Sequence, residues 1–478
     1  MSRPEPQATP PSSGPTGPVD PARSPGAIAL EVVRRAVLAA ASGVLAGMAC
    51  AAFLDALDRV TTVRLDHPWL VWLLPVAGLA IGASYHLFGG RAGEGNALLL
   101  EEIHEPTAWV PRRMAPLVGV GTVVSHLFGA SVGREGTALQ MSGSLTDLLA
   151  RVVRLPARDR RWLLVAALGG GFGAVFGVPW AGAIFAVEVQ TVRRNGFAAV
   201  RSWIVRRGHR PIPLRDPPPV VSWTARVGSL LVLGGPALVA AVVGDQVVRH
   251  LGYHHPARPQ PHPGLDPALL GRVAVIGVAL GLAAVAFVEV TEAIKHGAAR
   301  VGWAPLRPFV GGLAVLGLVA LVGRDELGLS LPLIAHALDG DHTSLAAPAL
   351  KVLLTAICLG TGFVGGEVTP LFVIGATLGS AIAPALGLDP VVGAAVGFVG
   401  AFAGATNTPV ACTVMGVELF GPALTIPLAI GCVASYACSG GRGIYATQRM
   451  AGSAGPERIR DRPALIHRAR RRPASRDG

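Results

Sequence analysis

Charged and aromatic residues are scarce in this chain of 478 residues: Asp, Glu, Lys and Arg together make up 15% of it, and Phe, Trp and Tyr make up 5%. The average soluble domain is about one-quarter charged, so a water-soluble enzyme of this length would lack the polar surface that it needs. Hydrophobic residues account for 51% of the chain, and apolar stretches recur from end to end. The composition argues against a soluble enzyme, a disordered protein or a coiled coil, and it predicts an all-α, polytopic membrane protein.

Cysteine is also rare, and its spacing predicts no metal site. The five cysteines lie apart within apolar segments, without a CxxC motif or a Cys/His pattern. The stretch Glu-Glu-Ile-His-Glu at 101–105 lacks a second histidine at helical spacing. We therefore predict no metal and no cofactor.

Basic residues exceed acidic ones by 41 to 29, and their distribution predicts how the chain crosses a membrane. Arginine gathers at 151–161, at 193–215 and after residue 457, and each cluster flanks an apolar segment. Basic loops stay on the cytoplasmic side, so we expect a multi-pass protein of the cell inner (plasma) membrane with cytoplasmic termini. Aromatic residues are not interleaved with the basic ones, which argues against a nucleic-acid partner.

Glycine (62 residues) and proline (39) are abundant, and many lie inside the apolar stretches. Membrane helices tolerate such breaks where the backbone is buried or lines an aqueous cavity. Several apolar segments are also shorter than the roughly 20 residues that cross a bilayer, so we predict many tilted, broken helices. The predicted helices cover residues 30–57, 69–88, 114–130, 137–153, 162–175, 179–192, 222–250, 267–296, 306–323, 347–363, 369–387, 391–405, 408–420 and 423–439.

Proline-rich and polar stretches divide the chain into four predicted parts. Residues 1–28 form a disordered, Pro-rich N-terminal tail, and 29–220 form the first transmembrane half. Residues 221–452 form the second transmembrane half, and 453–478 form a basic cytoplasmic tail. The boundary between the halves follows the polar loop at 206–219.

The two halves share a sequence pattern. Gly-x-Glu-x-Thr-x-Leu-x-x-x-Gly begins at Gly133 and again at Gly365, 232 residues later. A second match pairs the stretch that starts at Gly170 with the stretch that starts at Gly400, 230 residues later. Two matches in the same order indicate an internal repeat, and repeated halves place a transporter's substrate site at their interface near the middle of the membrane.

The repeated pattern has the features of an anion site. In Gly133-Arg-Glu-Gly-Thr137, glycines flank a charged residue just where an apolar helix begins. A helix N-terminus offers unpaired N–H groups and the positive end of a dipole, and Gly136 lets the backbone approach an ion closely. Glu135 would occupy such a site as a mimic of the anion and leave it when protonated. A simple helix cap, or a pair with Arg134, is the alternative role for this carboxylate.

The second copy of the pattern repeats this design. Gly365–Pro370 places the carboxylate of Glu367 at a helix start, and proline suits the first helical turn. The backbone N–H of Val368 and the hydroxyl of Thr369 are candidate donors to an anion.

Two further glycine-rich turns supply candidate donors. Asn96 follows the turn at 93–95, and ordinary N-capping is its alternative role. Tyr445 lies in the late turn Gly441-Arg-Gly-Ile-Tyr445, and a place in an aromatic belt is its alternative role.

These motifs, in this order, resemble the CLC family of chloride channels and proton-coupled anion antiporters. The resemblance rests on Gly133–Thr137, on Gly365–Pro370, on the Gly-Val-Pro and Ala-Gly-Ala-Ile-Phe-Ala-Val-Glu motifs within 177–188, and on the turn at Tyr445, and it spans roughly residues 30–450. It implies a homodimer in the lipid bilayer, in which each subunit has its own anion path between two halves of inverted topology.

The chain departs from the common chloride pattern of this family at the turns that would hold the anion. Asn96 stands in the first turn, Thr137 replaces a proline in the second, and Glu367 and Val368 stand in the third. Val189 occupies the position of the second glutamate of proton-coupled chloride antiporters. Together these departures resemble the fluoride/proton branch of the family.

The resemblance implies a fluoride/proton antiporter that exports fluoride, with Glu135 as the gating glutamate that also carries the proton. Fluoride holds water tightly, and an unpaired ion in hydrocarbon is very costly, so strong donors must replace its water. Fluoride also hydrogen-bonds strongly to a carboxylic acid, so protonated Glu135 and the ion can meet in one site. The implied anion-binding residues are Asn96, Gly136, Thr137, Glu367, Val368, Thr369 and Tyr445.

Two other functions stay open on the sequence alone. The first is a chloride/proton antiporter or a chloride channel of the same fold. The second is an intramembrane serine hydrolase, because Gly129-Ala-Ser131-Val-Gly133 matches the G-x-S-x-G elbow and His126 lies nearby. That elbow needs a strand-to-helix turn, and the sequence around it shows no strand pattern. We therefore expect that the protein is not an enzyme.

Three charged residues in apolar segments have simpler predicted roles. Glu188 and Glu418 occupy equivalent positions of the repeat, and buried hydrogen bonding is expected of both. Lys351 stands near the start of an apolar helix and is predicted to extend its amine to the membrane interface.

Overall fold

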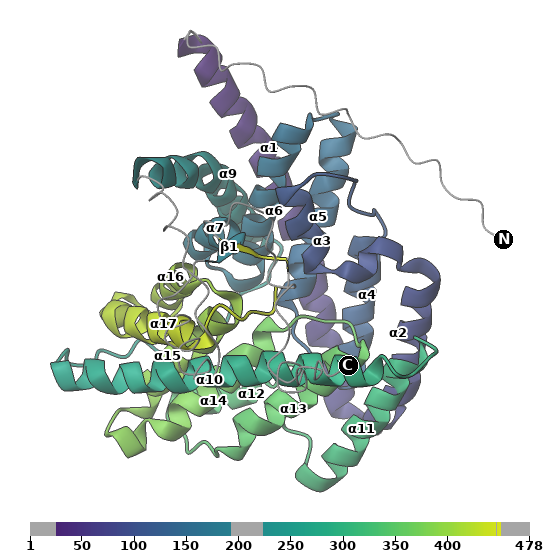
Figure 1. The fold of residues 1–478 in the computed structure, drawn as a ribbon, viewed down its shortest axis with the longest axis vertical. Coiled ribbons are helices and arrows are strands. Elements are labelled where there is room, and N and C mark those ends of the chain that lie inside the picture. The colour runs from purple at the N-terminus through teal and green to yellow at the C-terminus, as the bar shows by residue number, and fades with distance from the viewer. Residues whose placement is uncertain (1–24, 193–222, 446, 451–478) are drawn as a thin grey trace, which may run out of the picture.

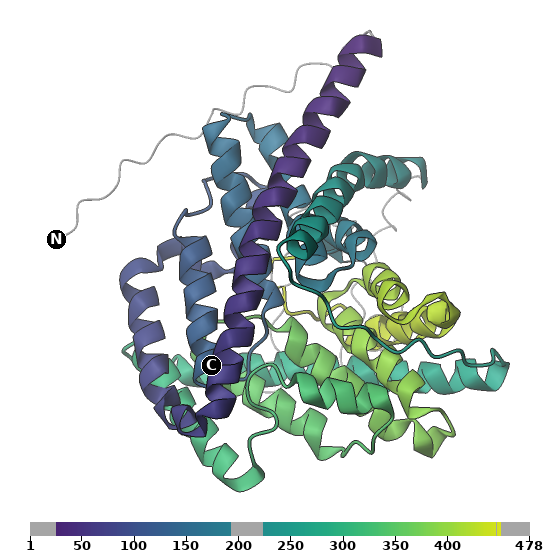
Figure 2. The same cartoon turned by 180° about the vertical axis from the view of Figure 1, so that it is seen from behind.

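A computed structural model describes residues 25–192, 223–445 and 447–450, and this part of the chain is built almost wholly of helices (Figures 1 and 2). Two strands of two residues each, β1 (Thr191–Val192) and β2 (Arg449–Met450), pair in parallel. The predicted all-α fold is therefore confirmed. The predicted C-terminal tail and most of the predicted N-terminal tail lie outside the described residues.

The helices follow one another with short connections. The helices before residue 251 are α1 (Pro25–Asp66), η1 (Pro68–Leu73), α2 (Leu74–Phe88), η2 (Gly90–Glu94), α3 (Asn96–His104), α4 (Met114–Leu127), α5 (Glu135–Val152), α6 (Ala157–Phe176), α7 (Pro179–Glu188) and α9 (Trp223–His250). The later helices are α10 (Pro267–Ala298), α11 (Leu306–Val322), α12 (Leu331–Asp339), α13 (Ala346–Thr361), α14 (Val368–Ile382), η3 (Pro384–Leu386), α15 (Pro390–Thr406), α16 (Pro409–Phe420), η4 (Pro422–Leu424) and α17 (Thr425–Ser439).

Two long helices cross the molecule in different directions. Helix α1 runs along the long axis and projects beyond the other helices at one end, whereas α10 runs across the molecule (Figures 1 and 2). Helix α1 has 42 residues, which at 1.5 Å per residue is about 63 Å and about twice the hydrocarbon thickness of a bilayer. It begins at Pro25, inside the stretch predicted to be a tail up to residue 28.

Left-handed residues and prolines break the helices at equivalent places in the two halves. Helix α6 ends at Gly177, with φ of 72°, and α7 begins two residues later at Pro179. Helix α15 ends at Asn407, with φ of 61°, and α16 begins two residues later at Pro409. A left-handed cap stops each helix, and the proline starts the next because its fixed φ suits a first turn.

Glycines let the helices of the second half approach closely. A β-carbon added at Gly375 of α14 would collide with the carbonyl group of Gly397 in α15, and Gly379 stands in the same relation to Gly393. Small residues of this kind are the usual contact between membrane helices, because they bring backbones within van der Waals distance. The close α14–α15 pair fixes the direction in which the N-terminus of α14 points.

Helix packing places α9 with the first half. Helix α9 packs against α1, α6 and α7, and α10 packs against α13, α15 and α17. The predicted boundary between the halves, at residue 220, lies outside the described residues and stays a prediction.

The described helices have the lengths and surfaces of a membrane protein. Four helical stretches are long and apolar enough to cross a membrane, and other apolar helices have only 10–17 residues. Large apolar side chains on the outside, such as Leu321 (84% exposed) and Leu87 (70%), face away from the protein. The four long stretches are Gly26–Asp66, Pro68–Phe88, Pro267–Ala298 and Pro422–Ser439.

The structure corrects the prediction for Lys351. Its side chain is completely buried in α13 rather than extended to an interface. The ammonium group donates to the carbonyl oxygens of Glu326 and Gly328 and to the Ser330 hydroxyl, at 2.8–2.9 Å. A buried ammonium is tolerated when its three donors are all used, and this one holds the loop between α11 and α12.

Candidate functional site

The two copies of the repeated pattern meet at the centre of the molecule. Gly133, just before α5, and Gly366, just before α14, form an isolated antiparallel bridge. The N–H of Gly133 donates to the Gly366 carbonyl at 2.6 Å, and the N–H of Gly366 donates back at 2.7 Å. A β-carbon on Gly366 would lie 2.7 Å from the Gly136 nitrogen, so this approach requires glycine. The bridge brings the positive ends of two helices to one place.

The carboxylate of Glu135, at the start of α5, is hydrogen-bonded by the N-terminus of α14. Glu135 is 1% exposed, and its Oε2 atom accepts a hydrogen bond from the Thr369 backbone N–H at 2.9 Å. The Thr369 hydroxyl lies 2.6 Å from both carboxylate oxygens. A backbone N–H and a hydroxyl at a helix N-terminus are donors suited to an anion. The side chain of Glu135 thus occupies an anion site built by α14.

Asn96 and Glu367 approach the same point. A β-carbon on Gly136 would lie 3.0 Å from the Asn96 side-chain nitrogen and 3.7 Å from Oε2 of Glu367. Asn96 is the first residue of α3, so a third helix N-terminus points here. Val368 is the first residue of α14 and is 1% exposed.

Tyr445 completes the group from the end of the chain. It is 5% exposed, and its hydroxyl interacts electrostatically with the carboxylates of Glu367 and Glu135. Within the part of the chain that the structure describes, Tyr445 Oη and Asn96 Oδ1 are buried without a hydrogen-bond partner. Buried polar atoms are normally hydrogen-bonded, so two such atoms without a partner near the Glu135 carboxylate indicate a binding site for a polar ligand.

A buried amide network holds the turn of Tyr445 in place. The Gln448 side chain donates to the carbonyls of Val189 and Thr406, at 2.9 and 2.7 Å, and accepts from Asn407 at 3.1 Å. The adjacent Ile444 N–H donates to a carbonyl of α15. No motif in the sequence indicated Gln448, because its partners lie up to 259 residues away.

An aromatic cluster from both halves lies beside Tyr445. The ring of Phe185 in α7 lies 6.3 Å from the Tyr445 ring and is stacked 4.4 Å from Phe172 of α6. Phe402 of α15 lies 6.0 Å from Phe185. The cluster makes one wall of the site apolar, so donors on the other walls act with little competition from water.

The predicted site residue Thr137 has another partner. Its hydroxyl lies 2.7 Å from the hydroxyl of Thr122 in α4, and both side chains are fully buried. The structure therefore brings Asn96, Gly136, Glu367, Val368, Thr369 and Tyr445 around Glu135, while the hydroxyl of Thr137 is bonded toward α4.

The side chain of Arg134 lies beside that of Glu135. Its Nε atom is 3.6 Å from Oε1 of Glu135, and its Nη1 donates to the Tyr253 hydroxyl at 3.2 Å. Tyr253 belongs to the loop 251–266 and carried no signal in the sequence. The alternative prediction, a pair between Arg134 and Glu135, describes one of several contacts that the carboxylate makes.

Glu188 and Glu418 cap each other's helices. The carboxylate of Glu188, at the end of α7, accepts from the N–H groups of Val410 and Ala411 at 3.1 and 2.7 Å. Glu418 in α16 accepts from the N–H groups of Trp180 and Ala181 at 3.0 and 2.8 Å. Both carboxylates thus have the hydrogen-bonding role expected of them, at half-buried rather than buried positions, and each neutralises a helix N-terminus.

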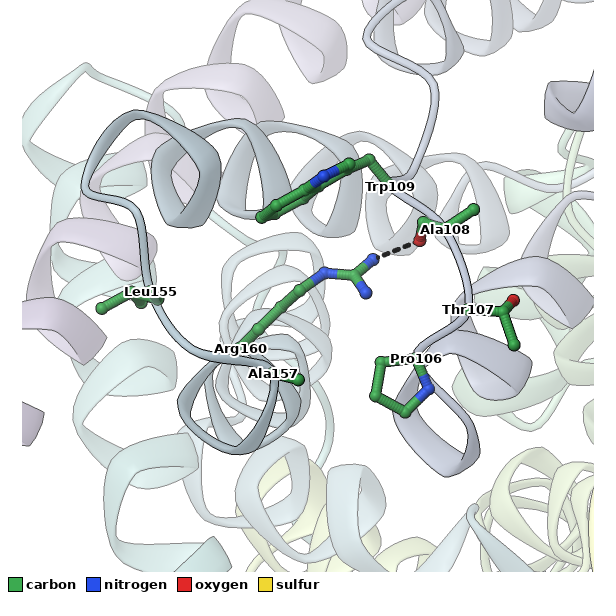
Figure 3. Close-up of a pocket in the computed structure, with 7 residues that line it drawn as sticks. All are labelled: Pro106, Thr107, Ala108, Trp109, Leu155, Ala157 and Arg160. Carbon is green, nitrogen blue, oxygen red and sulfur yellow. Dashed lines mark hydrogen bonds between the residues drawn. The ribbon is translucent and has the colours of Figure 1, made fainter. Parts of the chain in front are cut away.

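A buried ionic cluster anchors α3 at the end remote from Asn96. Arg160 donates to Asp147 at 2.5 Å, to Glu102 at 3.2 Å and to the Ala108 carbonyl at 2.8 Å. Figure 3 shows its guanidinium beside the ring of Trp109, at 4.8 Å from the ring centre, next to a cavity of about 20 Å³. Because every charge is paired, the cluster joins α3, α5 and α6 firmly.

Ser131 has a packing role. It is fully buried, its hydroxyl lies 2.9 Å from that of Thr355 and 3.1 Å from the Glu326 carbonyl, and its N–H donates to the Cys358 sulfur. His126, the suggested base, has its Nδ1 on the Thr122 carbonyl. These contacts hold the segment that leads to Glu135.

The arrangement can hold a small dehydrated anion in competition with a carboxylate. Donors from α14 and the side chains of Asn96 and Tyr445 surround one buried point, and an acid with a rotatable side chain occupies part of it. Protonation removes the charge of that acid, so its hold on the donors weakens and an anion can take its place.

A family model described as "Voltage gated chloride channel" matches residues 77–205 and 229–440 of the chain. The chain is 42% identical over 427 residues to the "Chloride/fluoride channel protein" of Pseudomonas syringae pv. tomato, and the match covers 86% of each chain. It is 26% identical to the "H(+)/Cl(-) exchange transporter ClcA" of Cronobacter sakazakii, covering 86% of this chain and 88% of that one.

Solved structures show the same fold. A crystal structure of a CLC-type fluoride/proton antiporter superposes with a TM-score of 0.78 and 29% identity, covering 88% of this chain and 99% of that one. A slow cyanobacterial Cl-/H+ antiporter superposes with a TM-score of 0.68 and 17% identity, covering 86% of this chain and 96% of that one. The predicted resemblance to this family is confirmed.

Proposed function

Because the chain belongs to the voltage gated chloride channel family, and is thus a membrane protein of anion transport, we propose that it is a proton-coupled fluoride antiporter that exports fluoride from the cell. Each turnover exchanges fluoride for protons across the inner membrane. Both termini of the chain lie in the cytoplasm in this proposal. A relative that is 42% identical carries fluoride as well as chloride in its name, and a fluoride/proton antiporter has the same fold.

One observation carries the proposal: the Glu135 carboxylate lies on the donors of α14. The Thr369 N–H and hydroxyl hold it at 2.9 and 2.6 Å, where they would otherwise hold an anion. Carboxylate and anion exclude each other there by charge and by space. A proton on Glu135 neutralises the acid, lets its side chain leave and admits the anion, which couples the two fluxes.

Fluoride fits the chemistry of the surrounding donors. A hydroxyl, an amide and backbone N–H groups, with a phenol opposite, replace the water that a small anion holds most tightly. The half-buried Glu367, near Gly136 and Asn96, repels anions when ionised but can donate a strong hydrogen bond to fluoride when protonated. Chloride, a weaker acceptor, gains less from these groups.

One glutamate serves both ions in this proposal. Val189 stands where proton-coupled chloride antiporters have a second glutamate, and both oxygens of the neighbouring Glu188 accept hydrogen bonds from α16. Glu135 therefore carries the proton itself.

The protein is proposed to be a homodimer and not an enzyme. Apolar side chains are exposed on the adjoining helices α7, α16 and α17, including Trp180 (59%), Val410 (56%) and Val433 (56%). A second copy covers this face in the proposed dimer, while lipid covers the rest of the apolar surface.

A chloride/proton antiporter is the second candidate, favoured by the 26% identity to a chloride exchanger. Purified protein in fluoride- or chloride-loaded liposomes separates the two. A fluoride electrode, a chloride electrode and a pH electrode follow efflux and proton uptake, with protein-free liposomes as the background.

We expect fluoride efflux much faster than chloride efflux, with protons moving in the opposite direction. Chloride efflux at an equal rate would assign the protein to the chloride antiporters. Fluoride efflux without proton movement would make it a channel.

A further inference from the structure

The guanidinium of Arg134 is held beside Glu135 by a residue far along the chain. Arg134 is 7% exposed, its Nη1 donates to the Tyr253 hydroxyl at 3.2 Å, and its Nε lies 3.6 Å from Oε1 of Glu135. An arginine side chain has several rotatable bonds, so its sequence position next to Glu135 does not place its charge. The hydrogen bond to Tyr253 fixes the position of the guanidinium.

Tyr253 is itself fixed in the connection between α9 and α10. It lies in the loop 251–266, and its N–H donates to the Val248 carbonyl at the end of α9, at 3.2 Å. The edge of its ring meets the ring of His255, 5.4 Å away. His255 in turn packs against Gly177, where a β-carbon would lie 2.5 Å from its Cδ2 atom. The left-handed glycine that ends α6 therefore makes the space for His255, and His255 supports Tyr253.

We propose that Tyr253 is a positioning residue, whose hydroxyl holds the Arg134 guanidinium in place so that Glu135 binds and releases its proton beside a fixed positive charge. The inference rests on the proposed function, in which Glu135 carries the proton. It assigns to the loop between α9 and α10 a part in setting the pH range of transport. A cation near a carboxylate favours the charged form, so releasing Arg134 would favour the protonated form.

The other groups around this pair come from several elements. Asp58 of α1 interacts electrostatically with Arg134, as does Arg258 of the loop 251–266. Tyr445 interacts electrostatically with both Glu135 and Glu367. Burial lowers the pKa of His255 to about 4, so this ring is neutral above that pH and contributes support rather than charge.

The test compares the pH dependence of anion efflux in four proteins. Wild type, Tyr253→Phe, Arg134→Gln and the double variant are reconstituted, and efflux is measured from about pH 4.5 to about pH 8, around the ordinary carboxylic-acid range and above it. Tyr85→Phe, on α2, is the matched loss of a hydroxyl elsewhere. Melting temperature and gel filtration verify that each variant is folded.

We expect the half-maximal pH of Tyr253→Phe to rise by about half a unit, which corresponds to about a threefold change in proton affinity. Tyr85→Phe should match the wild type. In the Arg134→Gln background, Tyr253→Phe should add no shift, because its effect passes through Arg134. A purely structural role for Tyr253 would instead lower the melting temperature and persist in the double variant.

An infrared titration gives the same midpoint without transport. The band of the protonated carboxyl that disappears in Glu135→Gln is followed against pH in purified protein. A wild-type midpoint in Tyr253→Phe, or an undiminished shift in the Arg134→Gln background, overturns the inference. Failure of the wild type to exchange fluoride for protons overturns the proposed function instead, and the infrared midpoint still decides the role of Tyr253.

Discussion

The turns that open α5 and α14 have the same sequence pattern, yet their side chains do different things. In α14, the Thr369 hydroxyl bonds the carboxylate of Glu135. In α5, the equivalent hydroxyl of Thr137 bonds Thr122 of α4. The repeat offset of 232 residues puts the apolar Leu354 where α4 has Thr122, so nothing equivalent competes for the hydroxyl of Thr369. The two equivalent hydroxyls thus have different partners, and the turn of α14 binds the carboxylate that the turn of α5 supplies.

The largest effect should come from exchanging the two glutamates of these turns for glutamine. Glu135→Gln should lower proton movement by about a hundredfold, a scale typical of a lost acid–base group. Glu367→Gln keeps the proton carrier and should chiefly alter the ratio of fluoride to chloride efflux. Electrode measurements on liposomes decide this, and equal loss of proton movement in both variants would contradict the assigned asymmetry.

A smaller effect is expected from the two threonines. Thr369→Val removes the hydroxyl that meets both carboxylate oxygens, and a hydrogen bond to a charged group contributes about 1.5–3 kcal/mol. The fluoride concentration for half-maximal efflux should therefore rise about tenfold or more. Thr122→Val, the matched change on α4, should alter it by less than about twofold. If the Thr122 variant had the greater effect, α5 rather than α14 would be the receiving turn.

The smallest effect is expected from Glu188 and Glu418, which have the same capping role in the two halves. Glu188→Gln and Glu418→Gln each remove a charge from a helix N-terminus, which costs about 0.3–2 kcal/mol. Both variants should melt a few degrees lower, by similar amounts, and should retain proton-coupled efflux. Melting curves in detergent and flux in liposomes give the comparison. Loss of coupling in the Glu188 variant alone would show that it relays protons.

Local sequence predicted the parts of this site that lie on the repeated pattern. The glycine turns around Glu135 and Glu367 and the helices that follow them depend on residues within a few positions, whereas the places of Asn96 and Tyr445 at the site were implied by the family resemblance. The structure adds contacts made across long separations, which leave no local pattern. The 3.2 Å contact of Arg134 with Tyr253 spans 119 residues.

Burial and packing produced the other differences from the sequence predictions. Lys351 was predicted to lie at the membrane interface because the sequence around it shows no partner for a buried charge. Its partners are two carbonyl groups and a serine in the loop between α11 and α12, more than 20 residues earlier. The packing of helix α9 on α1, α6 and α7 likewise joins segments that lie far apart in the sequence. Neither carbonyl positions nor helix neighbours can be read from composition.

The two backbone hydrogen bonds between Gly133 and Gly366 hold the N-termini of α5 and α14 together. Helices joined in this way cannot separate to widen the passage without breaking both bonds. The carboxylate of Glu135 can nevertheless leave the donors of α14 by torsions of its own side chain while both of these bonds stay intact.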